Sequence, residues 1–472
     1  MTITQQLADI ALGFQYDTIP AEARDVSKRL IVDALACGIG GYHSETGRIV
    51  RDFAAEYGPR PEASLIGTNL RVSCSAAIIA NQAMLRYLDY NDDLPIAVGP
   101  GNLVAAHPSG ALPVAFAVAE RVGASGAQLI ETMVAGYEVI GRLLAGFKTS
   151  LEVRGVHHGS VLPYAGCAMA GRLLGLKSSE IAHAMGIAGS LTVGLDILDA
   201  EGEEYTMTKN LADGMLSERG YAAAQMAKRG LTGPERIIEG HKGFAEVLLG
   251  GTNMFVWAAE RRGEPWILNA VIKGMCAEAT THGHLQATTS LVREHKLVPE
   301  DIALISIRTN QRSVYHTGDP VKKYPRNKET ADHSAYFLTA MAVIQGKITP
   351  RIYAQANFTD PTVIGLIEKI ALVHGPEYDA IVPAAEVTIE LRNGSRLVRR
   401  VDKDDLVGEP TNRMSDARLR AKFVECTEGI MTPSEVDRII EQCLSLEKLD
   451  RVEDLMKLTR IATKDPLAKE HA

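Results

Sequence analysis

Aromatic side chains are scarce in this sequence, at 5% of all residues, while alanine, leucine and glycine are abundant. Such a composition favours closely packed helices over an aromatic-rich β-sandwich. Cysteines are few and widely separated, and no two form a C-x-x-C pair; they are Cys37, Cys74, Cys167, Cys276, Cys426 and Cys443. No H-E-x-x-H motif, EF-hand pattern or phosphate-binding G-x-x-x-x-G-K-[ST] loop replaces them. If the chain is an enzyme, we expect it to work with side chains alone, without a metal or an organic cofactor.

Basic clusters and long apolar runs are missing as well. The formal net charge is -8 and the isoelectric point is near 5.9, so nucleic acid is not an expected partner. The first residues lack a basic region followed by an apolar core, and no later stretch runs for eighteen residues without a polar residue. We expect a soluble cytoplasmic protein with no membrane partner.

What the sequence does contain is helical periodicity. The stretch "TIPAEARDVSKRLIVDALACGIGG" places Pro20 near a helix start, followed by an apolar stripe at helical spacing. Ser125 and Gln128 form a possible capping box ahead of another such stretch. Similar segments rich in alanine and glycine continue along the chain. Residues 1–268 are therefore predicted to form a large all-helical domain.

The pattern changes in the last part of the chain. Residues from Ile302 alternate between apolar and polar, and Asn393-Gly394 stands between two alternating runs, which predicts a β-hairpin. Further on, Thr432, Pro433 and Glu435 form an N-terminal helix signal. We predict a mainly α fold, in which a smaller α+β domain at residues 269–403 is inserted and residues 404–472 return to the helical domain. The crevice between the two domains is then a natural binding site.

Polar residues stand out in two stretches of the helical part. "LDYNDD" contains Asp89 and Asp93, and "AAHPSG" follows with His107 at a loop-to-helix junction. Asp89 alone is as well explained by helix capping or by exposure to solvent. "GVHHGS" puts His157 and His158 beside glycine and serine at a helix start, where backbone amides could bind an anion. Adjacent side chains face different directions, so at most one of the two histidines is expected in a pocket.

Three further stretches carry similar chemistry. They are "YTMTKNL" with Lys209, "IKGMCAEATTHGH" with Lys273, His282 and His284, and "ETADHSAYF" with Asp332, His333, Ser334 and Tyr336. Spacing alone predicts that Lys209 is exposed to solvent and that "ETADHSAYF" is the capped start of a helix. Together, the five stretches supply the lysines and histidines needed to bind a small carboxylate and to move a proton beside it.

At these residues the sequence resembles the MmgE/PrpD family, whose members include 2-methylcitrate dehydratase and cis-aconitate decarboxylase. The resemblance covers nearly the whole chain, through "RLIVDALACGIGG", "LDYND", "HPSG", "GVHHGS", "GLTGPERIIEGHKGF", "IKGMCAEATTHG" and "ETADHSAYF". It implies a helical domain with an inserted α+β lid, a site between the two, no metal or organic cofactor, and a homodimer.

Carried over by motif, the family's site residues fall on Asp89, His107, His157, Lys209, Lys273 and His282. The resemblance implies that the lysines bind substrate carboxylates and that the histidines share acid and base duties, with His157 in the pocket and His158 making local bonds. Two positions differ from the family pattern in a way that affects which substrate the site could bind. Asp93, a candidate for substrate binding, adds a carboxylate, which repels a trianion unless it points away or meets a cation. A substrate with an amine or imine nitrogen would instead suit this carboxylate, which keeps the epimerase alternative open. Phe337 stands where family members commonly have tyrosine, and Tyr336 is the candidate to replace it in substrate binding.

The resemblance implies a cofactor-independent lyase that dehydrates a citrate-like hydroxy acid such as 2-methylcitrate, by removing an α-proton and expelling a β-hydroxyl. A decarboxylase of cis-aconitate, or an epimerase or isomerase of a small dicarboxylate, would use nearly the same groups. A non-catalytic protein that binds di- or tricarboxylates is a third reading. It would need the lysines but not the set of acid-base histidines.

Overall fold

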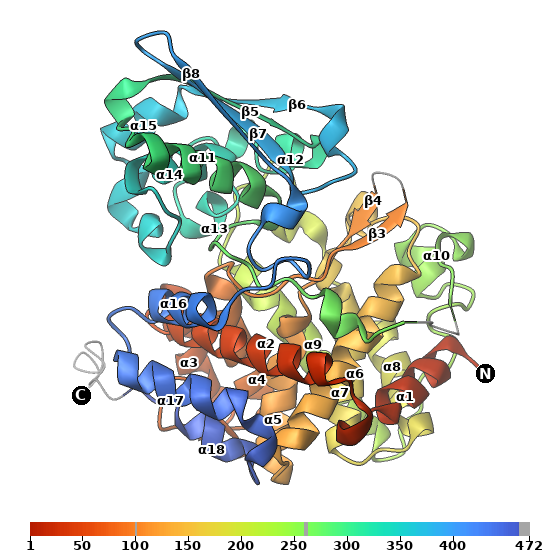
Figure 1. Ribbon diagram of the computed structural model, residues 1–472. Helices are drawn as coiled ribbons and strands as arrows, with labels where there is room; N and C mark the ends of the chain where they lie inside the picture. Colours follow the sequence, from red (N-terminus) through yellow and green to blue (C-terminus); the bar gives the residue numbers. More distant parts are fainter. Residues whose placement is uncertain (100–101, 259–262, 462–472) are drawn as a thin grey trace.

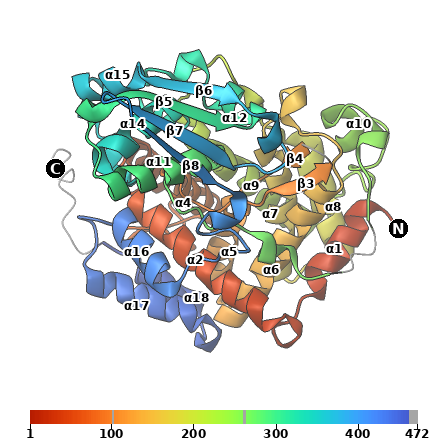
Figure 2. The ribbon, with the colours of Figure 1, turned by 45° about the horizontal axis from the view of Figure 1, so that its top comes forward.

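The structure, a computed structural model, describes residues 1–99, 102–258 and 263–461. It consists of a larger helical body and a smaller α+β body that lies on one side of it, at the top of Figure 1. Figure 2 shows the same arrangement turned so that its top comes forward, with the sheet of the smaller body facing the viewer. The predicted mainly α fold with an additional α+β part is confirmed.

The helical body is built around three helices, of which α7 and α4 both pack against α9. Small residues allow this close packing. A Cβ atom added at Gly220 in α9 would lie 2.3 Å from the carbonyl oxygen of Pro163 in α7. The helices of this body up to residue 248 are α1 (Ile3–Gly13), α2 (Ala21–Gly40), α3 (Glu45–Tyr57), α4 (Cys74–Tyr87), α5 (Leu112–Val122), α6 (Gly126–Ala145), α7 (Leu162–Leu173), α8 (Ser178–Leu191), α9 (Thr208–Ala227) and α10 (Phe244–Leu248).

The helix signals of this part are confirmed, but the helical body is not purely helical. Pro20 directly precedes α2, and Ser125 and Gln128 form the capping box of α6. Two short antiparallel strand pairs correct the prediction of an all-helical domain: β1 (Ala63–Ser64) with β2 (Arg71–Val72), and β3 (Ile96–Gly99) with β4 (Asn102–Val104). Strands of two to four residues are too short to give a periodic pattern in the sequence.

The smaller body carries a four-stranded sheet in the order β6-β5-β7-β8, in which only β5 and β6 run parallel. The predicted hairpin is confirmed, because β7 and β8 pair across Gly394, which has a φ of 85°. Helix α11 packs against β7, β8 and α14. The elements are α11 (His282–His295), β5 (Ile302–Thr309), α12 (Gln311–His316), α13 (Lys328–Ala331), α14 (Ala335–Gln345), α15 (Pro361–Ile367), β6 (Ile370–His374), β7 (Ala385–Leu391) and β8 (Arg396–Val401).

The last helices return to the helical body. Helices α16 (Asp416–Cys426) and α17 (Pro433–Leu444) pack against α2, and α18 (Val452–Lys457) packs against α5. In Figure 1 these blue helices lie beside the red N-terminal ones. The predicted capping box of Thr432 and Glu435 is present at the start of α17. The domain boundaries after residues 268 and 403 stay predictions, and residues 462–472 of the predicted C-terminal part lie outside the described residues.

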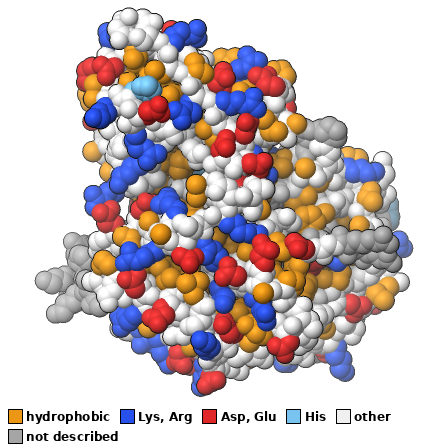
Figure 3. Space-filling model, viewed as in Figure 1, with side chains coloured by type: hydrophobic (Ala, Val, Ile, Leu, Met, Phe, Trp, Pro, Cys, Tyr) orange, Lys and Arg blue, Asp and Glu red, His pale blue; other side chains and the backbone are white. Residues whose placement is uncertain are grey.

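The surface carries charges of both signs. On the face shown in Figure 3, lysine and arginine side chains are interspersed with aspartate and glutamate. Within residues 1–99, 102–258 and 263–461, no helix has both the length and the apolar character needed to cross a membrane.

Candidate active site

A cavity of about 50 Å³ lies where the α+β body meets the helical body. A second cavity, of about 70 Å³, shares Asp93, Lys273, Glu278 and Arg312 with the first. A cavity lined by many titratable groups is the default candidate for an active site. The charged and titratable residues that line the first cavity are Arg86, Asp89, Asp93, His107, Glu152, His158, Asp199, Lys273, Glu278, Arg312, His316 and His333.

Asp89 is the centre of a buried ion cluster on this wall. It follows the end of α4 with a φ of 47°, a left-handed conformation that turns the chain sharply. Its Oδ1 lies 2.6 Å from both Arg86 Nη1 and Lys273 Nζ, and its Oδ2 lies 3.2 Å from Lys209 Nζ. Burial opposes ionisation, but these cations outweigh it and hold the pKa of Asp89 well below its usual range. Asp89 therefore neither caps a helix nor faces solvent.

The two predicted lysines have different places in this cluster. Lys273 lines both cavities, and its ammonium donates to the side chain and carbonyl oxygen of Asp89 and to the carbonyl oxygen of Ala277. Lys209 is only 2% exposed and lines neither cavity, so it is not the solvated lysine that its spacing suggests. Its ammonium lies between Asp89 and Asp332, 3.2 and 3.5 Å away. Lys209 can act on a ligand only through these carboxylates.

A hydrogen bond to the backbone fixes His107 in the tautomer that can act as a base. Its Nδ1 lies 2.7 Å from the carbonyl oxygen of Asp92, so Nδ1 carries the proton and donates it, which leaves Nε2 as the acceptor. Asp92 is itself fixed by the backbone N–H of Ser109 at 3.1 Å and by the hydroxyl of Tyr137 at 2.6 Å. Burial, with Arg86 and Lys273 nearby, lowers the pKa of His107 well below its usual value. His107 is a neutral base on the cavity wall.

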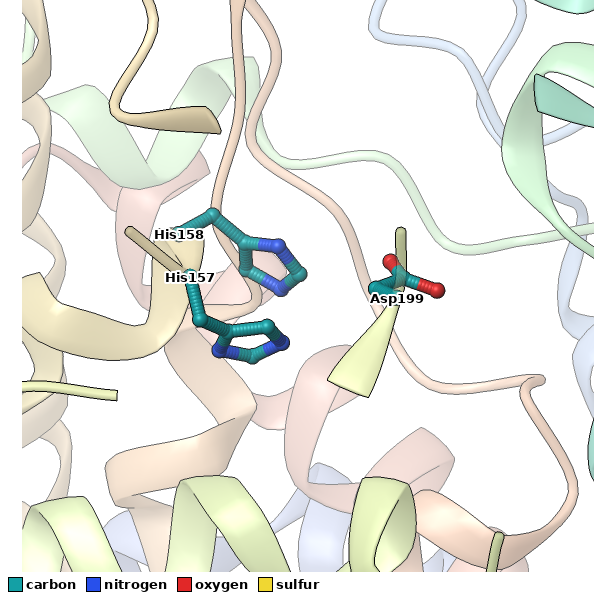
Figure 4. Close-up of side chains that lie close together, drawn as sticks. All are labelled: His157, His158 and Asp199. Atoms are coloured by element: carbon teal, nitrogen blue, oxygen red, sulfur yellow. The ribbon is translucent and has the colours of Figure 1, made fainter. Parts of the chain in front are cut away.

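The two histidines of "GVHHGS" are placed in the opposite way to the expectation. His158 lines the cavity, whereas His157 does not and lies behind it, with the ring centres 4.0 Å apart. In Figure 4 the two rings lie one above the other, with Asp199 across from them. His157 Nδ1 accepts a hydrogen bond from the Gly159 N–H, so it is His157 that makes the local bond. The chain turns just before them at Gly155, which has a left-handed φ of 68°.

Of the remaining candidate residues, Asp93 and His282 line a cavity and Tyr336 does not. Asp93 lines both cavities, and burial raises its pKa to about 6. His282 lines the second cavity, and its Nε2 lies 3.2 Å from the carbonyl oxygen of Ala277. Tyr336 lines neither cavity, and its hydroxyl donates to the carbonyl oxygen of Gly318 at 2.9 Å. Its part in substrate binding stays a prediction.

Several residues of the wall were not predicted from the sequence. Arg312 lies at the start of α12 and pairs with Glu152 at 3.1 Å, which ties the α+β body to the helical body. Asp199 and His316 come from loops or helix ends whose local sequence carries no motif. His333 was singled out, but without a role. Only the folded chain brings these residues together, so a search by spacing could not find them.

Comparisons with known proteins agree with the fold and its two parts. Residues 5–255 match the MmgE/PrpD N-terminal domain, and residues 275–446 match the MmgE/PrpD C-terminal domain. The cis-aconitate decarboxylase of Mus musculus is 26% identical, over 100% of this chain and 95% of its own length. The mitochondrial 2-methylcitrate dehydratase of Yarrowia lipolytica is 24% identical over 93% of this chain and 86% of its own length, and the 2-methylcitrate dehydratase of Escherichia coli (strain K12) is 25% identical over 81% of each. Decarboxylases and dehydratases of this kind are both lyases.

Proposed function

The chain belongs to the MmgE/PrpD family, and on that premise we propose that it is a lyase that dehydrates a citrate-like hydroxy acid such as 2-methylcitrate. The reaction removes a proton from the carbon next to a carboxylate and expels the hydroxyl from the neighbouring carbon. The observation that carries the proposal is His107, a neutral imidazole whose tautomer leaves Nε2 as a proton acceptor on the cavity wall. A base positioned in this way contributes about 10²-fold to 10⁴-fold in rate.

Cations beside His107 would stabilise the charge that develops when the proton leaves. Lys273 lines both cavities and is held in place by three oxygen atoms, so it needs no rearrangement during the reaction. Arg86 and Arg312 line the first cavity as well. Fixed cations in a buried site stabilise an enolate-like oxygen more than they would in water. In this proposal the three cations orient the carboxylates of the substrate.

His158 is the second acid-base candidate. Its Nε2 is buried and has no hydrogen-bond partner among the described residues, and burial lowers the pKa of the ring to about 4. The ring of His107 lies 5.1 Å away, centre to centre. Two neighbouring imidazoles on one wall can serve the two ends of an elimination. The base takes the carbon-bound proton, becomes an imidazolium and can deliver this proton to the departing hydroxyl, which leaves as water. The other imidazole, still neutral, can donate its ring N–H to the hydroxyl oxygen.

Decarboxylation of cis-aconitate is a second candidate function. The extent of the similarity favours it. The similarity to the decarboxylase of Mus musculus covers 100% of this chain, whereas the similarity to the dehydratase of Escherichia coli covers 81%. Loss of carbon dioxide leaves a carbanion that must be protonated, so the same histidines and cations serve that reaction. Proton transfer without loss of a group, as in an epimerase, needs no further residue either.

Proton NMR in D₂O distinguishes these reactions. The purified, chelator-treated protein is incubated separately with 2-methylcitrate, citrate, cis-aconitate and a small dicarboxylate with a stereocentre next to a carboxylate. Dehydration of citrate gives a new olefinic proton signal. 2-Methylcitrate loses the proton of its methyl-bearing carbon, so its methyl doublet becomes a downfield singlet and no olefinic proton appears. Either change supports the dehydratase, and itaconate from cis-aconitate supports the decarboxylase in its place. Deuterium that enters without a net product indicates an epimerase. Ligands that raise the melting temperature while no signal changes would contradict the proposed lyase and favour a binding protein.

A further inference from the structure

The two cavities of the candidate site adjoin each other and differ in chemistry. They meet at the residues that line both: Asp93, Ala105, Lys273, Glu278, Ala279 and Arg312. Among the described residues, every side chain that lines only the first cavity is titratable. Most of those that line only the second cavity are apolar, namely Pro95, Leu103, Val271, Val382 and Pro383. The combined space is therefore charged at one end and largely apolar at the other.

The apolar walls of the second cavity come from both bodies and are held by backbone contacts. Val271 and Asp93 pair through two backbone hydrogen bonds, of 2.8 and 3.0 Å. Leu103 lies on β4, which pairs with β3 in the helical body. Pro383 precedes β7 in the smaller body, and its carbonyl oxygen would lie 2.0 Å from a Cβ atom added at Gly283. Because these segments are packed closely, the cavity exists before a ligand binds.

The charges of the second cavity are balanced. Acidic and basic side chains line it in equal number: Asp93, Glu278 and Glu409 against Lys273, Arg312 and Lys403. His282, which also lines it, is neutral near pH 7, because burial lowers its pKa to about 4. A further carboxylate would find no excess of positive charge there, whereas an uncharged group needs none.

The proposed base lies where the two cavities meet. His107 lines the first cavity and follows Ala105, which lines both, by two residues. Its Nδ1 lies 3.8 Å from Oδ1 of Asp93, which also lines both. In a 2-substituted citrate, the carbon that loses the proton also carries the substituent. A substrate with its carboxylates in the first cavity and its α-proton toward His107 can therefore direct this substituent into the second cavity.

We propose that the second cavity binds the alkyl chain of a 2-alkylcitrate, and that chains longer than the methyl group of 2-methylcitrate fit it best. The inference rests on the proposed lyase, because it takes the first cavity to hold the carboxylates. The reaction is the same: the α-proton and the hydroxyl leave as water, and the product is a 2-alkylaconitate. Chain and wall lose contact with water together, which strengthens binding about fourfold for each buried methylene.

The volume of the second cavity limits the length of the chain. The cavity measures about 70 Å³, and a water molecule needs about 10–15 Å³ on this scale. A methylene group is similar in size to water, so about four such groups fit, which corresponds to a propyl or butyl chain. Lys403 and Glu409 line only this cavity and lie 3.7 Å apart as an ion pair. Atoms of a longer chain that reach this pair gain no apolar contact.

The test uses 2-alkyltricarballylates, which carry the chain and three carboxylates but have no hydroxyl to lose, so their binding does not depend on turnover. Calorimetric titration of the full chain with the methyl, ethyl, propyl and hexyl compounds measures their affinities. We expect the affinity to rise about fourfold per carbon from methyl to propyl, and the hexyl compound to gain little more. Turnover of the 2-alkylcitrates with the same chains, followed by NMR, should give kcat/KM values in the same order.

Filling the second cavity should remove the preference for longer chains. Val382→Phe narrows it from the smaller body and Leu103→Phe from the helical body, so one variant remains if the other fails to fold. In both, the methyl compound should bind as in the wild type, while the propyl compound should bind at least about tenfold more weakly. Val373→Phe is the matched control, because Val373 lies on β6, is 43% exposed and lines neither cavity. It should leave the whole series unchanged.

The outcomes separate this inference from the proposed lyase. Equal or falling affinity from methyl to propyl in the wild type would overturn it, even if 2-methylcitrate is dehydrated. Retention of the wild-type preference in both Val382→Phe and Leu103→Phe would overturn it as well. A series of analogues that bind more tightly with chain length, without turnover of any alkylcitrate, would support the apolar subsite and contradict the dehydratase.

Discussion

Lys422 Nζ lies 2.5 Å from Asp33 Oδ1, although the two residues are on α16 and α2, near opposite ends of the chain. Both side chains are buried. The same ammonium donates to the carbonyl oxygens of Tyr90 at 2.7 Å and Lys273 at 2.9 Å. One buried lysine therefore ties the C-terminal helices to the N-terminal ones and fixes the two backbone segments that carry Asp89 and Lys273 into the cavity.

Replacing this lysine should destabilise the whole fold. Lys422→Met leaves Asp33 buried without its cation, and the loss of one partner of a buried pair costs about 3–5 kcal/mol. Denaturant unfolding measures the change. Adding Asp33→Asn should recover part of the loss, because the remaining buried group is then neutral. Arg420 is in the same helix as Lys422, and its exposed partner Asp437 is in α17. Arg420→Met, which breaks this pair, should cost less than about 1 kcal/mol. Equal losses in Lys422→Met and Arg420→Met would show that burial of the pair has no such effect.

His107 is expected to be needed for turnover and not for folding. His107→Gln removes the basic Nε2, so kcat should fall by about 10²-fold to 10⁴-fold while the melting temperature changes little. Steady-state kinetics on the substrate identified by NMR, together with thermal unfolding, measure both quantities. His374→Gln serves as the control, because that residue lies on β6. If His107→Gln kept the wild-type kcat, His107 would not be the base.

His158 should matter more for turnover than His157. His158 lines the cavity, and His157 lies behind it, bonded to the Gly159 N–H. We expect His158→Gln to lower kcat at least about tenfold more than His157→Gln does. We expect His157→Gln to act mainly on thermal stability, because its Nδ1 accepts a buried backbone N–H. A larger loss of kcat in His157→Gln, with stability retained, would restore the original assignment from the sequence.

Asp93 should make substrate binding depend on pH. Burial raises its pKa to about 6, partly opposed by Lys273, so its carboxyl is neutral below that pH and charged above it. The charged form repels a polycarboxylate, and KM should therefore rise as the pH increases from about 5 to 8. In Asp93→Asn the rise should be smaller, and KM at pH 8 should be lower than in the wild type. Asp17→Asn, at an exposed position, should behave as the wild type does. An unchanged pH profile in Asp93→Asn would contradict this role.

Gly220 should tolerate no side chain. Its Cβ would lie 2.3 Å from the carbonyl oxygen of Pro163, a backbone atom that cannot move aside cheaply. We expect Gly220→Ala to lower the free energy of unfolding by about 1–3 kcal/mol. Gly365 in α15 is the opposite case, because nothing lies within 4 Å of its added Cβ. Gly365→Ala should raise the free energy of unfolding by about 0.5–1 kcal/mol, since alanine favours helices more than glycine does. Denaturant unfolding of both variants measures these changes. If Gly220→Ala and Gly365→Ala lowered the free energy of unfolding equally, the close packing of α7 against α9 would be refuted.

The fold could be predicted largely from the sequence, because its signals are local. Pro20, the capping box at Ser125 and the turn at Asn393-Gly394 act within a few residues of themselves, and the structure has each of them where it was predicted. The short strand pairs were missed because two to four residues carry no period. The family could be recognised because its motifs follow one another along nearly the whole chain.

The sequence by itself determined the elements, their order and the supply of histidine, lysine and aspartate. It could not determine which of two adjacent histidines faces the cavity, because the other residues of the cavity wall come from distant segments. It gave no sign that Lys209 is paired from two sides or that Asp199 lies beside His316 and His333. These contacts join residues more than a hundred positions apart. Distances of this kind are set by how the two bodies pack, so only the tertiary structure decided the charge and proton positions of the candidate site.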